Sequence, residues 1–272
     1  MMIKNNIIHL SAWKLKEKIE IQELTSQEIT EAFIERIEQV NPFVNAYCTT
    51  TFDLARKLAK EGDLRVKKNE PLGLLNGIPI SIKDLVLTRG IRTTFGSKIF
   101  EHFIPDMDDI VVERLKKHGC VILGKTNTPE FGHMGFTKNK IFGETKNPWN
   151  LTKTPGGSSG GAVAAVASGM SPLALGSDGG GSIRIPAAFC GVYGLKPTLG
   201  RVPMYPREKT SRPGILACQG PITRYVKDAA LMLDVIKGYH WGDEYSLPDN
   251  SISYFKEIEN TPNNIKIGYS LD

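Results

Sequence analysis

Apolar residues recur at helical spacing between residues 29 and 40. They fall every three or four positions, which places them on one face of a helix: Ile29, Phe33, Ile34, Ile37 and Val40. Thr25, with Glu28 three positions later, forms a capping box that predicts where this helix begins. Asn41-Pro42 predicts its end, because the residue before a proline is disfavoured in helical geometry.

The remainder of the first seventy residues is predicted to be mainly helical. The run VNAYCTT at 44–50 is typical of a short strand, and the apolar pattern predicts a second amphipathic helix near residues 52–61. The charged stretch EGDLRVKKNEP that follows predicts a surface loop. Residues 1–70 are therefore expected to form a mainly helical N-terminal region.

From residue 71 the pattern changes to short apolar runs that alternate with helices. Residues 78–82 predict a strand that ends at Lys83. A helix is expected over about 109–118, closed by Gly119, and CVIL at 120–123 predicts a short buried strand. Such alternation is typical of an α/β domain with a largely covered sheet.

The block from 154 to 200 is rich in glycine, alanine and serine. GAVAAVASG at 161–169 predicts a helix with almost no bulk, which can pack close to a neighbouring backbone. PLALGSD at 172–178 predicts a strand that runs into the loop GGGS. A further helix is expected over about 226–237, and residues 265–269 predict a last strand.

Composition and charge argue against several classes of function. With 272 residues, 40% hydrophobic and 23% charged, the chain has the composition of a folded globular protein. Its net charge of +5 is spread along the sequence without a basic run interleaved with aromatic residues, so no nucleic-acid-binding motif is present. No stretch approaches the ~18 consecutive apolar residues of a membrane span, and the first residues lack the features of a signal peptide. A cytoplasmic protein is expected.

The cysteines and histidines show no metal-binding pattern. Cys48, Cys120, Cys190 and Cys218 are far apart, with no C-x-x-C pair, and the five histidines include no H-E-x-x-H. We therefore expect reduced, buried thiols, and neither a metal ion nor a cofactor.

Two short motifs match known patterns without the structural context that each requires. GCVILGKT at 119–126 has Walker A spacing, but its middle residues predict a strand and its first glycine closes a helix. GGSSG at 156–160 fits the nucleophile elbow G-x-S-x-G, but the segment before Ser158 has two prolines and predicts no strand. The only histidine after it is His240. Nucleotide binding and an α/β-hydrolase triad are disfavoured, as is a flexible linker, because the run continues into an alanine-rich helix.

The second glycine cluster, GSDGGGS at 176–182, has the composition of an oxyanion hole. Its glycines allow a sharp turn that exposes successive N–H groups beside a hydroxyl, so that they can stabilise developing negative charge. The candidate donors are the N–H groups of Gly179, Gly180, Gly181 and Ser182. A phosphate-binding or purely conformational turn is the alternative.

A serine nucleophile needs a base, and Lys83 at the end of strand 78–82 is a candidate. In water a lysine with a pKa near ~10.4 is a poor base at neutral pH, whereas burial disfavours the charged form and can lower that pKa by several units. An ordinary ion pair with Asp84 is the alternative role for this lysine.

Together these segments resemble the amidase signature family. The resemblance rests on TPGGSSGGAVAAVASGMSPLALGSDGGGSIRIPAAFCGVYGLKPT and on GIPISIKDL, and it extends in the family's order through GKTNTPEFG, GETKNPWN, LGRVP and QGPITRYVKDAALMLDVIKG. It covers nearly the whole chain from residue 25. It implies an α/β fold with a mixed central sheet covered by helices on both faces, and a catalytic core over residues 71–240.

The resemblance implies a Ser–cis-Ser–Lys triad. Ser182 would be the nucleophile, Ser158 the bridging serine after a cis peptide bond with Gly157, and Lys83 the base. The lysine would accept the proton of the bridging serine, which in turn accepts that of the nucleophile. The implied reaction is hydrolysis of a carboxamide through an acyl-enzyme, without metal or cofactor.

Three further residues have supporting roles by the same resemblance. Ser159 would be a hydrogen-bonding group, and Asp178 with Arg184 would hold the nucleophile loop in place. A surface ion pair is the alternative for the last two.

The sequence departs from the family pattern in two respects. Many relatives, including the glutamine-hydrolysing subunit of the tRNA-dependent amidotransferase, have threonine at the position of Gly179, so DGGGS favours a stand-alone amidase. Family members are also considerably longer, so residues 1–272 are expected to form a single amidase domain that lacks its C-terminal part.

The expected function is therefore hydrolysis of a small aliphatic or aryl amide. The alternatives are the glutaminase (A) subunit of a tRNA-dependent amidotransferase and a truncated, non-catalytic amidase-like protein. The expected partners are the amide substrate and either a second copy or a partner chain that completes the domain. Nucleic acid and membranes are not expected as direct partners.

Overall fold

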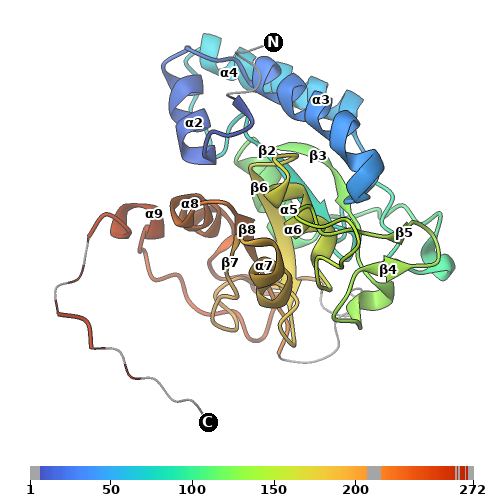
Figure 1. The fold of residues 1–272 in the computed structure, drawn as a ribbon. Helices are drawn as coiled ribbons and strands as arrows, with labels where there is room; N and C mark the ends of the chain where they lie inside the picture. The colour runs from blue at the N-terminus through green and yellow to red at the C-terminus, as the bar shows by residue number, and fades with distance from the viewer. Residues whose placement is uncertain (1–6, 207–215, 261, 263, 267, 269–272) are drawn as a thin grey trace.

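The computed structural model describes residues 7–206, 216–260, 262, 264–266 and 268. Within them, one mixed sheet has the strand order β1-β3-β2-β6-β8-β7 (Figure 1). Its strands are β1 (Tyr47–Thr50), β2 (Pro79–Lys83), β3 (Val121–Thr126), β6 (Leu173–Asp178), β7 (Tyr193–Gly194) and β8 (Cys218–Thr223). Strand β2 is parallel to β3 and β6, whereas β1 and β8 are antiparallel to their neighbours.

Helices surround this sheet, and α2, α3 and α4 gather on one side of the molecule (Figure 1). The helices are α2 (Ala12–Glu20), α3 (Ser26–Val44), α4 (Phe52–Lys67), α5 (Ile110–Lys117), α6 (Gly160–Ala167), α7 (Arg184–Cys190), α8 (Val226–Ile236) and α9 (Tyr254–Glu257). Two single 3₁₀ turns, η1 (Lys98–Phe100) and η2 (Glu130–Gly132), and a short ladder of β4 (Lys138–Asn139) with β5 (Gly143–Glu144) complete the regular structure.

The core lies on both faces of the sheet. Successive residues of a strand point to opposite faces, and β6 shows this directly. Ala174 packs in a cluster with Val163 of α6, while Leu173 belongs to a second cluster that contains Leu231 of α8. The predicted α/β fold, a mixed sheet with helices on both faces, is confirmed.

Helix α3 begins as the sequence predicts and ends later. Thr25 and Glu28 form the full capping box. The predicted stop at Asn41-Pro42 is wrong, because α3 continues through Pro42 to Val44. Pro42 lacks the N–H that would bond a carbonyl one turn earlier, but it does not end the helix. The helix ends after Val44, where the Asn41 C=O accepts the N–H of Asn45 and the Asn41 Oδ1 accepts those of Ala46 and Tyr47.

Helix α4 is longer than the apolar pattern indicates. The predicted charged loop from residue 61 is wrong over its first half, because the helix continues to Lys67. Asp63, a charged residue in that segment, is buried and its carboxylate accepts hydrogen bonds from the N–H groups of Ser26 and Gln27. This contact with the start of α3 explains why a charged residue of α4 is buried.

Most other predicted elements are present, with shifted ends. Helix α5, capped by Asp109, and helix α8 match their predicted ranges closely, and β3 extends the predicted strand 120–123 to Thr126. Of the predicted last strand, residues 267 and 269 lie outside the described residues, and the described positions between 265 and 268 form no strand.

Strand β8 was not predicted. Its sequence, CQGPIT, contains Gly220-Pro221, which is typical of a turn. In the structure it pairs antiparallel with β6 over its whole length and is fully buried. The contacts of the sheet, rather than local preference, make this segment a strand.

Candidate active site

Lys83 lies at the end of strand β2 and is fully buried. Its Nζ lies within hydrogen-bonding distance of three serine hydroxyls: Ser158 Oγ at 2.6 Å, Ser159 Oγ at 2.8 Å and Ser177 Oγ at 3.1 Å. These serines come from the two glycine-rich segments that the sequence singles out. The fold therefore brings the predicted base to the predicted bridging serine.

The surroundings of Lys83 suit a neutral amine. Complete burial disfavours the charged ammonium form of a lysine. The next residue, Asp84, directs its carboxylate to the backbone N–H and the hydroxyl of Thr94 instead. The Asp84 carboxylate therefore has hydrogen-bond donors of its own in Thr94.

Ser158 lies in the loop that leads into helix α6. The peptide bond between Gly157 and Ser158 is cis, the geometry that the family resemblance implies. The carbonyl of Ser158 accepts a hydrogen bond from Thr128 Oγ1 at 3.1 Å. A Cβ on Gly157 would lie 2.7 Å from the carbonyl oxygen of Met134, so this position has room only for glycine.

Ser182 shares a cavity with the other serines. The cavity has a volume of about 220 Å³, and Ser158, Ser177 and Ser182 all line it. The lining also includes His133 and the apolar side chains of Leu85, Phe131 and Ala217. Ser182 is half-buried, and its carbonyl accepts the N–H of Ser159 at 3.1 Å, which fixes the two glycine-rich loops against each other.

The predicted oxyanion donors are not equivalent. The N–H of Gly181 is donated to Asp178 Oδ1 at 2.8 Å, so it is already used within the loop. For the N–H groups of Gly179, Gly180 and Ser182, the described residues provide no acceptor within hydrogen-bonding distance. These three residues line the cavity and are the remaining candidate donors.

Asp178 and Arg184 form a bidentate ion pair that links the two ends of the nucleophile loop. Arg184 Nε donates to Oδ2 at 3.0 Å and Nη2 donates to Oδ1 at 2.9 Å. The carboxylate also accepts the N–H groups of Gly181, Ile183 and Arg184. Burial alone would raise the pKa of Asp178, but the hydrogen bonds from Arg184 and from these backbone groups outweigh it and lower the pKa to about 2. The carboxylate is fully buried although the guanidinium is half-exposed, so this is a structural clamp and not a simple surface pair.

Replacing Asp178 with asparagine should destabilise the fold by about 1–3 kcal/mol, because the hydrogen bonds to a charged acceptor are lost or weakened. The folded pKa lies below the unfolded value of 3.8, so the stabilisation by Asp178 is complete above that pH and disappears as pH falls toward about 2. Urea unfolding at neutral pH and at about pH 3 should show the difference between the two proteins narrowing in acid. Asp53→Asn, at a fully exposed carboxylate, is the control, and equal stability of Asp178→Asn and wild type at neutral pH would contradict the role.

Two residues of this site were missed by sequence reasoning. Ser177 bonds Lys83 directly, and its N–H and C=O both contact Ser159 Oγ. Thr128 holds the carbonyl of Ser158. Both had an available signal: Ser177 immediately precedes Asp178 at the end of a predicted strand, and Thr128 lies within GKTNTPEFG, one of the segments that carry the family resemblance.

The two disfavoured motifs have other roles in the structure. Lys125 of the Walker A match is buried in β3 and donates to the carbonyl of Val86 and to the hydroxyls of Thr88 and Thr93, so it holds the loop after β2. Burial lowers its pKa to about 8. His240 packs on Tyr205 and does not line the cavity. In the described part of the chain, no group of three or more metal-ligating side chains is placed to hold a metal ion.

Comparison with known proteins identifies the family of this chain. A family model described as Amidase matches residues 28–272. The chain belongs to the amidase signature family. Solved amidases of this family share its α/β fold.

A curated relative of this amidase-family chain is the A subunit of the glutamyl-tRNA(Gln) amidotransferase from Carboxydothermus hydrogenoformans. It is 45% identical over 268 residues, which are 96% of this chain and 54% of the relative. Among solved structures, a bacterial aryl acylamidase of the same family superposes with a TM-score of 0.87 at 38% identity and covers 92% of this chain and 51% of its own. The corresponding amidotransferase protein of Thermotoga maritima gives 0.73 at 35% identity, over 90% and 50%. The chain thus spans about half the length of the relatives it matches.

Proposed function

We propose that this chain contributes the catalytic site of a glutaminase, the A subunit of a tRNA-dependent amidotransferase. The observation that carries the proposal is the 45% identity to a protein of that name over nearly all of this chain. The similarity to the solved amidotransferase protein of Thermotoga maritima supports it. The sequence alone favoured a stand-alone amidase because of Gly179, but a single position weighs less than identity over 268 residues.

The proposed mechanism uses the serine cluster as a proton relay. Neutral Lys83 accepts the proton of Ser158, which accepts that of Ser182, and Ser182 Oγ attacks the carbonyl carbon of the amide. The N–H groups that line the cavity stabilise the oxyanion. The relay then runs in reverse and protonates the leaving nitrogen, so that ammonia departs and leaves an acyl-enzyme, which water hydrolyses.

The contacts of Lys83 support this order of events. A neutral amine has two N–H groups and one lone pair, so Nζ can donate to Ser159 and Ser177 and accept the proton of Ser158, whose Oγ lies 2.6 Å away. The shared cavity supports the second step, from Ser158 to Ser182. Ser159 and Ser177 position the amine in this scheme. They accept hydrogen bonds from the lysine, which a polar group in a buried site requires.

Stand-alone hydrolysis of an aryl amide is the second candidate function. It is favoured by Gly179 and by the TM-score of 0.87 to an aryl acylamidase. The apolar side chains in the lining of the cavity, Leu85, Phe131 and Ala217, would suit an apolar acyl group.

We also propose the setting in which the chain acts. Residues 1–272 supply the catalytic part of a single amidase domain, and the protein works in the cytoplasm. All four cysteines are free thiols, which suits a reducing compartment. In the described residues, no helix combines the length and the apolar character needed to cross a bilayer.

A substrate comparison tests the proposed function. Ammonia release from glutamine and from an aryl acetamide should be measured with the chain alone and with the candidate partner proteins of an amidotransferase added. We expect glutamine turnover that increases at least ~10-fold when a partner protein is present, because a partner that completes the site pre-organises it. Turnover of the aryl amide without any response to partners would favour the second candidate and contradict the first.

A further inference from the structure

His133 lies on the catalytic cavity but takes no part in the proton relay. It lines the cavity of about 220 Å³ together with Ser158 and Ser182. Its side chain is exposed, and no described residue forms a hydrogen bond or ion pair with the imidazole. Apart from serines, the described lining has one other polar side chain, Asp178, which is already paired with Arg184. The imidazole of His133 is therefore available to a bound substrate.

The turn that carries His133 is fixed by packing. In η2 the N–H of Phe131 donates to the carbonyl of Phe95 at 2.8 Å, and the N–H of His133 donates to that of Glu130 at 3.2 Å. The ring of Phe131 packs edge-on against Phe100 with 6.2 Å between the ring centroids, and Phe100 packs edge-on against Phe95 at 5.1 Å. An exposed side chain on a turn anchored in this way is pre-organised to bind a ligand.

Gly132 brings this turn close to the serine cluster. A Cβ on Gly132 would lie 3.3 Å from Ser158 Oγ and 2.7 Å from Leu85 Cδ1, and its φ of +75° is left-handed, so the position requires glycine. His133 is the next residue, and it is exposed whereas Ser158 is buried. Its imidazole therefore lies toward the open side of the cavity, beside the part of a substrate that extends away from the reacting amide.

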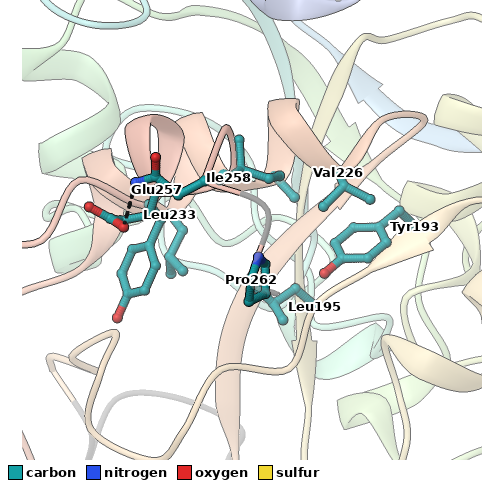
Figure 2. Close-up of a pocket in the computed structure, with 11 residues that line it drawn as sticks. Tyr193, Leu195, Val226, Leu233, Glu257, Ile258 and Pro262 are labelled. Carbon is teal, nitrogen blue, oxygen red and sulfur yellow. Dashed lines mark hydrogen bonds between the residues drawn. The ribbon is translucent and has the colours of Figure 1, made fainter. Parts of the chain in front are cut away.

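A second cavity in the described part of the chain is not placed for this role. It has a volume of about 500 Å³ and lies between β7, α8 and α9, where Figure 2 shows Tyr193, Val226 and Leu233 around it. It has no lining residue in common with the catalytic cavity. Its side chains are therefore not placed to contact a substrate whose carbonyl carbon is attacked by Ser182 Oγ.

We propose that His133 is a specificity-determining residue, which selects amides whose acyl chain carries a carboxylate. A neutral imidazole has one N–H donor and a protonated one has two, so either form can donate to a carboxylate oxygen. Among the described residues of the lining there is no lysine or arginine, so His133 is the donor that such a carboxylate meets. Glutamine is one amide of this class. Because His133 has this role only if the serine cluster is the reacting site, the inference rests on the proposed function.

A matched pair of amides tests this selection. Glutaramate and pentanamide have acyl chains of equal length, and the first has a carboxylate where the second has a methyl group. We expect the wild type to prefer glutaramate. His133→Leu should lower the ratio of kcat/KM for glutaramate to that for pentanamide by at least ~10-fold, mainly through KM, because a hydrogen bond to a charged group is lost.

Two further variants are controls for this ratio. His133→Gln has an amide NH2 that also donates, so it should retain most of the preference for glutaramate. His102→Leu removes another exposed histidine, which does not line the cavity, and should keep the wild-type ratio. An equal loss of both amides in His133→Leu, or an unchanged ratio, would overturn the selection by His133.

A binding measurement gives the same test without turnover. In the Ser182→Ala protein, which cannot be acylated, the NMR signals of the His133 ring are assigned from their loss in a second variant that also has His133→Gln. Glutaramate should shift these signals, and pentanamide at the same concentration should shift them much less. Equal shifts with both amides, or no shift with glutaramate, would contradict the proposed contact.

Glutamine, measured alongside, separates this inference from the proposed function. Hydrolysis of glutaramate that depends on His133, without any turnover of glutamine when partner proteins are present, would contradict the proposed glutaminase and support the selection of carboxylates. Turnover of glutamine with the same ratio for the two test amides in His133→Leu and wild type would support the glutaminase and remove His133 as the selecting residue.

Discussion

Replacing Ser182 with alanine should abolish acylation of the protein and reduce amide turnover by at least ~10⁴-fold, since a nucleophile acting with its base as one unit accounts for rate factors of this size. Ser182 is the half-buried hydroxyl of the cavity, which it shares with Ser158, the partner of buried Lys83. Intact-protein mass spectrometry after treatment with a fluorophosphonate should show one adduct on the wild type, located on the peptide that contains Ser182, and none on the variant.

Two further variants distinguish the roles of the serines in this experiment. Ser158→Ala should still be labelled, but slowly, because the nucleophile remains while its proton acceptor is lost. Ser168→Ala removes a hydroxyl that bonds the backbone of α6 and should be labelled like the wild type. Labelling of Ser182→Ala at the wild-type rate would assign the nucleophile to another residue.

Replacing Lys83 with methionine should slow acylation by ~10³- to 10⁵-fold at neutral pH, because the base of the relay is removed. Methionine has similar length and an apolar stem, so the buried volume is kept. The dependence of the acylation rate on pH gives a more specific prediction than the rate at one pH. In the wild type, acylation should decline as pH falls and the amine becomes protonated, whereas the variant should lose this dependence, because a general base acts only in its deprotonated form.

Lys125 provides the matched reference, because it is the other fully buried lysine on a neighbouring strand and its hydrogen bonds go to residues outside the serine cluster. Lys125→Met should lower stability and keep the wild-type pH dependence of labelling. Rates of fluorophosphonate labelling between about pH 6 and about pH 9 measure both variants. An unchanged pH profile in Lys83→Met would remove that lysine as the base.

Elements with strong local signals could be predicted from the sequence. The capping box at Thr25 and the periodic apolar residues of α3 depend on neighbours within one or two turns, and this helix begins where it was expected. Predictions from local sequence were wrong where a contact with a distant part of the chain determines the structure. Asp63 is buried against the start of another helix, and β8 forms through a Gly-Pro pair because β6 lies beside it.

For the candidate site, the chemical groups and the family can be recognised from the sequence alone. Ser158, Ser182 and Lys83 stand in three motifs that are recognisable before any fold is known, since a motif is a local property of the chain. Which of these groups are in contact depends on the tertiary structure. It brought Lys83 to Ser158 across 75 residues and added Ser177 to the cluster. It also assigned the N–H of Gly181 to Asp178 rather than to the cavity. Such distances follow from how the strands and loops pack together, and spacing along the chain does not encode them.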